Sequence, residues 1–263
     1  MKKISYHMVV VGTGGTGTTF LRDIGRYINN KPDCPIKKVT LVDGDVIEKK
    51  NIERQIFFPS QVGQHKATAM EHMLHCNYPD VSLEAVAKYL ATLDELKAIL
   101  HDVVVKDGRM PLLIGCVDNN AARLLLESYF LDGKVKDCVY FDSGNDYAAG
   151  EVIMSYKHGG RVLSPVRSEY FPEIKTGDLR PVTEMSCTEL NAVDPQHPLV
   201  NIMAGQILTS AVINLCEGRA KYSSVDFDAQ EFIEDAHPIV LSANNEEPAP
   251  EKEKPVSETE AAA

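Results

Sequence analysis

The chain has 263 residues, 44% of them hydrophobic and 25% charged, which is enough to build one medium-sized globular domain around a substantial core. The formal net charge of −11 argues against a nucleic-acid-binding surface as the main role. No apolar run approaches the roughly 18 residues that a membrane span needs. The cysteines include no C-x-x-C pair, which is typical of reduced cytosolic thiols rather than of disulfides or a zinc site. With no visible signal peptide, we expect a cytoplasmic protein that binds neither nucleic acid nor membranes.

Strand and helix patterns alternate along the first part of the chain. Apolar runs predict strands at Tyr6–Val11, Lys37–Val42, Val81–Ala87, Pro111–Cys116 and Cys138–Asp142. Helical periodicity predicts helices between them, at Thr16–Ile28, Gln61–Cys76, Leu93–His101 and Asn119–Leu131. Continuous apolar strands separated by helices are typical of a parallel sheet covered on both faces. We therefore expect an α/β fold, Rossmann-like and doubly wound, with a mainly parallel sheet.

The next part of the chain is less regular. A strand predicted at Ala148–Tyr156 precedes an irregular crossover segment, residues 157–199. A long apolar helix at Val200–Cys216 and a last strand at Tyr222–Phe227 follow it, and we expect antiparallel strands on this carboxyl-terminal side. A structureless span this long inside a compact domain is usually functional.

Residues 244–263 differ in composition from the rest, with six Glu, two Lys and no aromatic residue. Such a segment cannot bury enough apolar surface to offset the entropy lost on ordering. The sequence therefore predicts one folded domain over residues 1–243 and a disordered acidic tail over residues 244–263.

A glycine-rich turn follows the first predicted strand. It joins that strand to a predicted helix and contains Gly12, Gly14, Gly15 and Gly17. Glycines there let backbone N–H groups approach a phosphate at the helix amino terminus, where the helix dipole favours negative charge. On its own, the turn is equally consistent with an NAD- or FAD-binding domain.

Two carboxylates follow the second predicted strand. Asp43 ends the strand, where a carboxylate typically accepts hydrogen bonds from ribose hydroxyls, of NAD and ATP alike. Asp45 is either a turn-forming residue or a further ligand.

The next connection adds polar and cationic groups suited to phosphates, namely Asn51, Arg54, Gln55 and Lys66. A guanidinium chelates phosphate oxygens in a fixed geometry. Alternatively, Arg54 forms a surface ion pair with a neighbouring glutamate, and Lys66 is solvated. A dehydrogenase has little use for so many phosphate ligands, whereas an enzyme that splits a nucleoside triphosphate needs them.

Asp118 follows another predicted strand, at the edge where open α/β sheets bind ligands. A single carboxylate there suits Mg²⁺, which prefers one or two carboxylates together with phosphates and waters. The alternative is that Asp118 is the N-cap of the next helix. Asn119 and Arg123 are candidate supporting residues.

These elements resemble the ThiF/MoeB/HesA adenylyltransferases, bacterial relatives of ubiquitin-activating enzymes. The resemblance covers roughly residues 6–217 and rests on Gly12-x-Gly14-Gly15-x-Gly17, Asp43-x-Asp45, Asn51-x-x-Arg54-Gln55, Val62-Gly63-x-x-Lys66-Ala67 and Cys116-Val117-Asp118-Asn119. Within the family, the chain is most similar to the ThiF-related member of the ParB-related, ThiF-related (PRTRC) plasmid cassette.

The resemblance implies further features. In the family, the residue matching Lys66 contacts the nucleotide phosphates, and members that form a thioester or persulfide carry a cysteine where Cys187 stands; an unreactive loop thiol is the alternative. Many members bind structural zinc through paired C-x-x-C motifs, which this sequence lacks, so we expect no zinc. The family also implies a homodimer. Many members place an arginine from a longer amino-terminal segment in the partner's site, whereas here Lys2 and Lys3 are the basic residues before the first predicted strand.

We therefore expect an ATP- and Mg²⁺-dependent adenylyltransferase. Its substrate would be a carboxylate, by resemblance the carboxyl terminus of a ubiquitin-like or sulfur-carrier protein. Arg54, Lys66, the glycine-turn amides and a metal held by Asp118 would stabilise charge on the phosphates, and Cys187 would accept the acyl group if the reaction continues. Two alternatives are a non-catalytic nucleotide-binding interaction module of a plasmid or mobile element, and an NAD- or FAD-dependent oxidoreductase.

Overall fold

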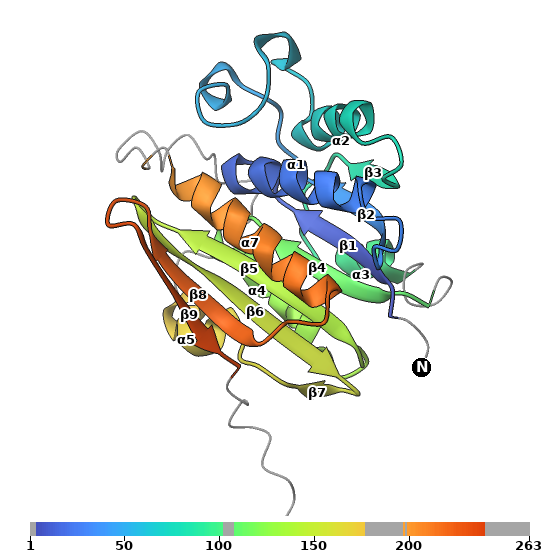
Figure 1. Ribbon diagram of the computed structural model, residues 1–263, viewed down its shortest axis with the longest axis vertical. Coiled ribbons are helices and arrows are strands. Elements are labelled where there is room, and N and C mark those ends of the chain that lie inside the picture. Colours follow the sequence, from blue (N-terminus) through green and yellow to red (C-terminus); the bar gives the residue numbers. More distant parts are fainter. Residues whose placement is uncertain (1–3, 102–107, 177–196, 198, 240–263) are drawn as a thin grey trace, which may run out of the picture.

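The computed structural model describes residues 4–101, 108–176, 197 and 199–239 (Figure 1). One sheet organises them, with strand order β3-β2-β1-β4-β5-β6-β8-β9 and β7 paired to β6. No helix within these ranges is long and apolar enough to cross a lipid bilayer.

The first half of the sheet is parallel and the second half is antiparallel. The parallel strands are β1 (Tyr6–Val11), β2 (Ile36–Val42), β3 (Leu83–Val86), β4 (Met110–Gly115) and β5 (Cys138–Asn145). The antiparallel strands are β6 (Ala149–His158), β7 (Arg161–Val162), β8 (Tyr222–Asp228) and β9 (Ile233–Pro238). The predicted Rossmann-like fold, with antiparallel strands on the carboxyl-terminal side, is confirmed.

Helices cover both faces of the sheet, and each face has its own buried apolar cluster. On one face lie α1 (Gly15–Asn29), α2 (Lys66–Asn77) and α7 (Val200–Cys216), with α1 and α7 packed side by side (Figure 1). On the other face lie α3 (Leu93–His101), α4 (Asn120–Leu131) and the short α5 (Arg167–Tyr170). The buried strands β1 and β4 are apolar on both sides because both sides are covered.

The central strand β1 lies between β2 and β4, so the chain winds outward from it in both directions. A crevice forms outside the carboxyl ends of the strands at such a switch point, and ligands bind there in open α/β sheets. The glycine turn after β1 and the residues after β4 meet at this crevice.

Three expectations about the elements were wrong in detail. The helix predicted from Gln61 begins at Lys66, because η2 (Pro59–Gln61) is a separate turn and Gly63, with φ of +91°, ends it. The predicted irregular segment contains β7, α5 and η4 (Pro172–Lys175) in its described part. A further strand, β9, follows the predicted last strand. Because β9 is an exposed edge strand, its sequence lacks the alternation of apolar and polar residues by which a strand is recognised.

The predicted acidic tail, residues 244–263, and Cys187 lie outside the described residues.

Candidate functional site

A cavity of about 540 Å³ lies at the carboxyl edge of the parallel strands. Residues that follow β1, β2, β4 and β5 form its wall, so the cavity occupies the switch point of the sheet. It brings together nearly every predicted ligand that the structure describes: Gly12, Gly14, Gly15, Asp43, Asn51, Arg54, Gln55, Lys66, Asp118 and Asn119.

Two glycines shape the turn between β1 and α1. Gly12 has φ of +94°, and a Cβ there would lie 2.3 Å from the carbonyl oxygen of Cys116. Gly17 lies beneath the turn, where a Cβ would lie 2.1 Å from the carbonyl oxygen of Gly12. Gly17 therefore allows α1 to pack closely on the turn, whereas Gly14 and Gly15 present their backbone to the cavity.

The amino-terminal ends of several helices face the cavity. Its wall includes Gly15 and Thr16 of α1, Lys66 of α2, Asn119 before α4, and Asn201 of α7. Backbone N–H groups in a first helical turn lack intrahelical acceptors, and the helix dipole adds positive potential there. Among the described residues, no side-chain hydrogen bond caps α1, α2 or α7. The cavity is therefore suited to anions.

Asp43 fixes the glycine turn. Its Oδ2 accepts hydrogen bonds from the backbone N and the hydroxyl of Thr13, at 2.7 and 2.9 Å, and its Oδ1 accepts one from the backbone N of Asp45, at 2.8 Å. Burial raises the pKa of Asp43, although the nearby charge of Lys66 opposes the shift. Asp43, which the sequence predicts to bind ribose hydroxyls, therefore already accepts hydrogen bonds from Thr13 and Asp45 that hold the cavity wall together.

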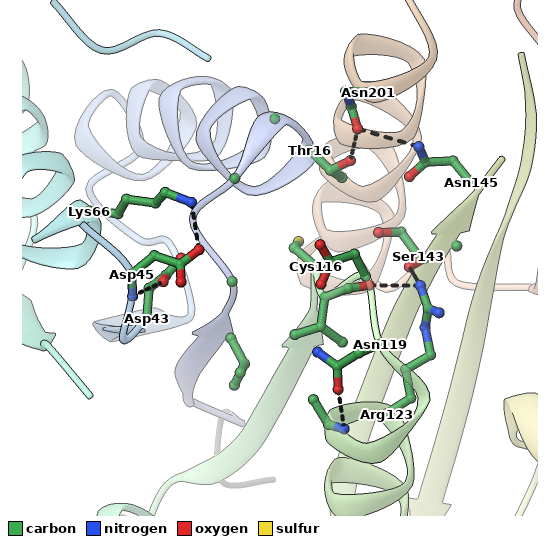
Figure 2. A pocket seen from close by; sticks show the side chains of 18 of the residues that line it. Thr16, Asp43, Asp45, Lys66, Cys116, Asn119, Arg123, Ser143, Asn145 and Asn201 are labelled. Carbon is green, nitrogen blue, oxygen red and sulfur yellow. Dashed lines mark hydrogen bonds and ion pairs between the residues drawn. The ribbon is translucent and has the colours of Figure 1, made fainter. Parts of the chain in front are cut away.

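Lys66 and Asp45 form an ion pair on the same side of the cavity (Figure 2). Lys66 Nζ lies 2.7 Å from Asp45 Oδ2, and the hydroxyl of Tyr89 donates to Asp45 Oδ1. Burial opposes ionisation of Asp45, but the charge of Lys66 and the hydrogen bonds from Lys66 and Tyr89 hold its pKa below the ordinary value. Asp45, which the sequence left between a turn and a ligand role, therefore orients Lys66.

Asn51 organises the turn that carries Arg54 and Gln55. Its side-chain oxygen accepts a hydrogen bond from the backbone N of Glu48, at 2.8 Å, and its carbonyl oxygen accepts from the backbone N of Arg54 and of Gln55, at 3.1 and 2.8 Å. Gln55 Oε1 is buried and accepts no hydrogen bond from any group that the structure describes.

Asp118 and Asn119, which follow β4, have different positions in the structure. Asn119, not Asp118, is the N-cap of α4, because its Oδ1 accepts a hydrogen bond from the backbone N of Ala122 at 2.8 Å. Asp118 is exposed and lines the cavity. Arg123 donates to the carbonyl oxygens of Val117, at 2.7 Å, and Ser143, at 3.0 Å, so it joins the ends of β4 and β5.

The chain also resembles proteins of known family. A sequence profile of the ThiF family matches residues 1–245. The chain belongs to the ThiF family.

Several known proteins are similar to part or most of this chain. Ubiquitin-like modifier-activating enzyme 5 of Xenopus laevis is 32% identical over 128 residues, which are 47% of this chain and 30% of that enzyme. The chain is thus matched to less than a third of this relative. The E. coli enzyme MccB has the same fold: its structure with ATP gives a TM-score of 0.62 at 16% identity, covering 92% of this chain and 65% of MccB. Its complex with N-formylated MccA gives 0.62 at 15% identity, covering 92% and 66%.

The residues that line the cavity of this ThiF-family chain without having been predicted include Tyr89, Asn145 and Asn201. Asn145 ends β5, so the rule that ligands bind at carboxyl ends of parallel strands would have found it. Tyr89 follows the short strand β3, and Asn201 lies in a long apolar helix. Neither position carries a motif, because both reach the cavity only through tertiary packing.

A buried ionic network lies behind the cavity. The guanidinium of Arg167, on α5, donates to the carboxylates of Asp142 and Glu151, and Glu151 lines the cavity. Burial opposes the charge of Arg167, but Asp142 and Glu151 raise its pKa. Burial raises the pKa of Glu151, against the effect of Arg167. The network fixes the wall formed by β5 and β6.

Proposed function

We propose that this ThiF-family protein activates a carboxylate by adenylation. A carboxylate oxygen attacks the α-phosphorus of ATP. The new O–P bond forms while the bond from that phosphorus to the bridging oxygen breaks, and pyrophosphate leaves with the electron pair. No proton moves, because the carboxylate is already ionised. The observation that carries the proposal is one cavity that combines Arg54, Lys66, Asp118 and several helix amino termini.

The side chains and the backbone have separate tasks in this step. Negative charge grows on the phosphate oxygens during the displacement, and fixed donors aimed at that charge stabilise the transition state without reorganising. The amides at Gly14 and Gly15 would hold the phosphate beside the turn, while Arg54 and Lys66 would hold the departing pyrophosphate. Asp45 supports this role because its carboxylate pairs with the buried ammonium of Lys66 and orients it.

Asp118 would hold Mg²⁺. Within the described ranges, no cluster of three or more His, Cys, Asp or Glu side chains could form an all-protein metal site. Mg²⁺ at phosphate sites normally uses one or two carboxylates and completes its shell with phosphates and waters, which suits Asp118 as an exposed carboxylate in the cavity wall. When bound, the ion would neutralise charge on the phosphates.

The carboxylate would belong to the carboxyl terminus of a small protein or peptide. Support comes from a relative named as a ubiquitin-like modifier-activating enzyme and from the fold shared with MccB, which forms a complex with MccA. We therefore propose a ubiquitin-like or sulfur-carrier protein as partner. From the family resemblance we also propose a homodimer as the active form.

Cys187 is proposed as acceptor of the acyl group after adenylation: its thiolate attacks the acyl carbon, the C–S bond forms as the bond from that carbon to the phosphate oxygen breaks, and AMP leaves with the electron pair. In Cys187→Ser, exchange of pyrophosphate into ATP should persist, since that reaction uses the nucleotide cavity. A covalent, reductant-sensitive adduct with the partner should disappear. An adduct that persists in this variant would place the nucleophile elsewhere.

The proposal is tested first by binding and then by exchange. Calorimetric titration should give tighter binding of ATP with Mg²⁺ than of NAD, and the reverse order would favour an oxidoreductase. Labelled pyrophosphate should then exchange into ATP when candidate small proteins that end in Gly-Gly are supplied. ATP binding without exchange across the candidates would favour a non-catalytic module.

A further inference from the structure

Three polar side chains from three elements meet at the end of the cavity opposite Lys66 (Figure 2). Asn201 Oδ1, on α7, accepts a hydrogen bond from the hydroxyl of Thr16, on α1, at 3.0 Å. The same oxygen accepts from Nδ2 of Asn145, at the end of β5, at 3.4 Å. These contacts join the amino termini of α1 and α7 to the edge of the sheet.

The two hydrogen bonds to its oxygen also orient the amide nitrogen of Asn201. Oxygen and nitrogen diverge from one planar carbon, so holding the oxygen fixes the direction of the N–H donors. Nδ2 lies 2.8 Å from the point that a Cβ on Gly15 would occupy, which places it over the first residue of α1. Asn201 therefore carries its donors to the glycine turn, where the phosphate chain would lie.

In-line displacement requires the attacking group and the leaving group to lie toward different ends of the cavity. The attacking oxygen and the departing oxygen lie on opposite sides of the phosphorus. If Lys66 holds the pyrophosphate, the carboxylate must arrive from the side away from Lys66. Figure 2 shows Thr16, Asn145 and Asn201 on that side, with Asp43, Asp45 and Lys66 across the pocket.

On this basis, and resting on the proposed adenylation, we propose that Asn201, supported by Asn145, positions the substrate carboxylate for attack and then holds the acyl oxygen of the adenylate. Both side chains are uncharged. An ammonium or guanidinium at this point would pair with the carboxylate and reduce its nucleophilicity. Amide donors and the amino terminus of α7 orient an anion without neutralising it. Asn201 and Asn145 are thus positioning residues specific for the acyl end of the reaction.

The test uses two nucleotide analogues and ATP, so it does not require the natural partner. The methyl ester of AMP is a monoanion that lacks an acyl group, whereas 5′-O-(N-(acetylglycyl)sulfamoyl)adenosine, whose acylated sulfamate nitrogen is ionised, is a stable analogue of an acyl-adenylate with the same charge. Calorimetry on the full-length protein gives the ratio of the two affinities, which isolates the acyl group. Wild type should prefer the acylated analogue, and Asn201→Ala should lower that preference by about tenfold, the effect of one lost hydrogen bond. ATP affinity should change little.

Asn201→Asp separates positioning from a structural role. An aspartate keeps an oxygen that accepts from Thr16 and Asn145, so a structural role would survive, but it replaces the donor with an acceptor. We expect the preference for the acylated analogue to disappear in this variant. Gln206→Ala, on an exposed turn of α7, is the matched control and should behave as wild type.

The contrary outcomes are distinct. An equal loss of ATP affinity and of acyl-analogue affinity in Asn201→Ala would assign the amide to the phosphates and overturn the inference. An unchanged preference in both Asn201 variants would overturn it as well. Failure of wild type to bind ATP would instead refute the proposed function itself.

Discussion

The ammonium of Lys66 lies 2.7 Å from Oδ2 of Asp45, in the wall of the cavity, and the side chain of Lys66 is only 5% exposed. An ammonium removed from water to this degree needs a partner charge. Tyr89 donates to the other oxygen of Asp45, so this carboxylate is fixed between a cation and a phenol. The pair therefore holds the ammonium of Lys66, a proposed phosphate ligand, in a fixed position at the cavity wall.

Removing one member of this pair should destabilise the fold. Asp45→Asn should lower the free energy of unfolding by on the order of 2 kcal/mol, because a hydrogen bond between charged groups is lost and the Lys66 charge stays buried. Urea unfolding of Asp45→Asn, Lys66→Met and the double variant gives the coupling energy. The double variant should be less destabilised than the sum of the single variants, and additive effects would show that the pair contributes nothing.

The same pair predicts a pH dependence. The folded-state pKa of Asp45 lies below its unfolded value, which is about 3.9 for an aspartate. Its stabilisation is therefore complete above that unfolded value and is lost as the pH falls through the lower, folded value. Melting curves in acid should show a smaller loss of stability for Asp45→Asn than for wild type. Parallel curves would contradict the assignment.

Asp118 and Asn119 are neighbours with different predicted roles. Asp118→Asn should leave the melting temperature unchanged, since the side chain is exposed, but should remove the dependence of ATP affinity on Mg²⁺. With a partner identified, pyrophosphate exchange should fall at least about a hundredfold, as expected for a catalytic metal. Calorimetry with and without a chelator measures the first effect. Mg²⁺-dependent ATP binding retained in Asp118→Asn would refute the metal role.

Asn119→Ala should show the reverse pattern, with lower stability and with Mg²⁺-dependent ATP binding retained. It removes the cap of α4, which typically costs about 1 kcal/mol of stability. Because Asn119 also lines the cavity, ATP affinity is measured alongside. If ATP affinity falls by more than the loss of stability accounts for, Asn119 also binds the nucleotide.

The parts of the site that sequence predicts are those fixed by local chemistry. The turn from Gly12 to Gly17, Asp43 and Asp118 all follow apolar strands, and strand ends converge wherever a parallel sheet forms. Asn201 differs, because its contact with Thr16 joins residues 185 positions apart. Local patterns record neither that packing nor the approach of Tyr89 to Asp45. That Asn119 and not Asp118 caps α4 was equally hidden, since both residue types cap helices well.

Two glycines with nearly the same backbone angle give a matched test of the glycine turn. Gly12 has φ of +94° and Gly63 has φ of +91°. A Cβ on Gly12 would lie 2.3 Å from the carbonyl oxygen of Cys116, whereas a Cβ on Gly63 would meet no described atom within 4 Å. Gly63→Ala should therefore incur the backbone cost alone, on the order of 1 kcal/mol.

Gly12→Ala should incur that cost and a collision with the end of β4. We expect its free energy of unfolding to fall by at least about 3 kcal/mol, in the range of severe overpacking, and its ATP binding to be lost because the turn must move away from the phosphates. Urea unfolding and ATP titration of both variants make the comparison. Equal destabilisation of the two variants would mean that the turn relaxes freely around an added methyl group, and the close approach of Gly12 to Cys116 would then not be what holds the cavity in shape.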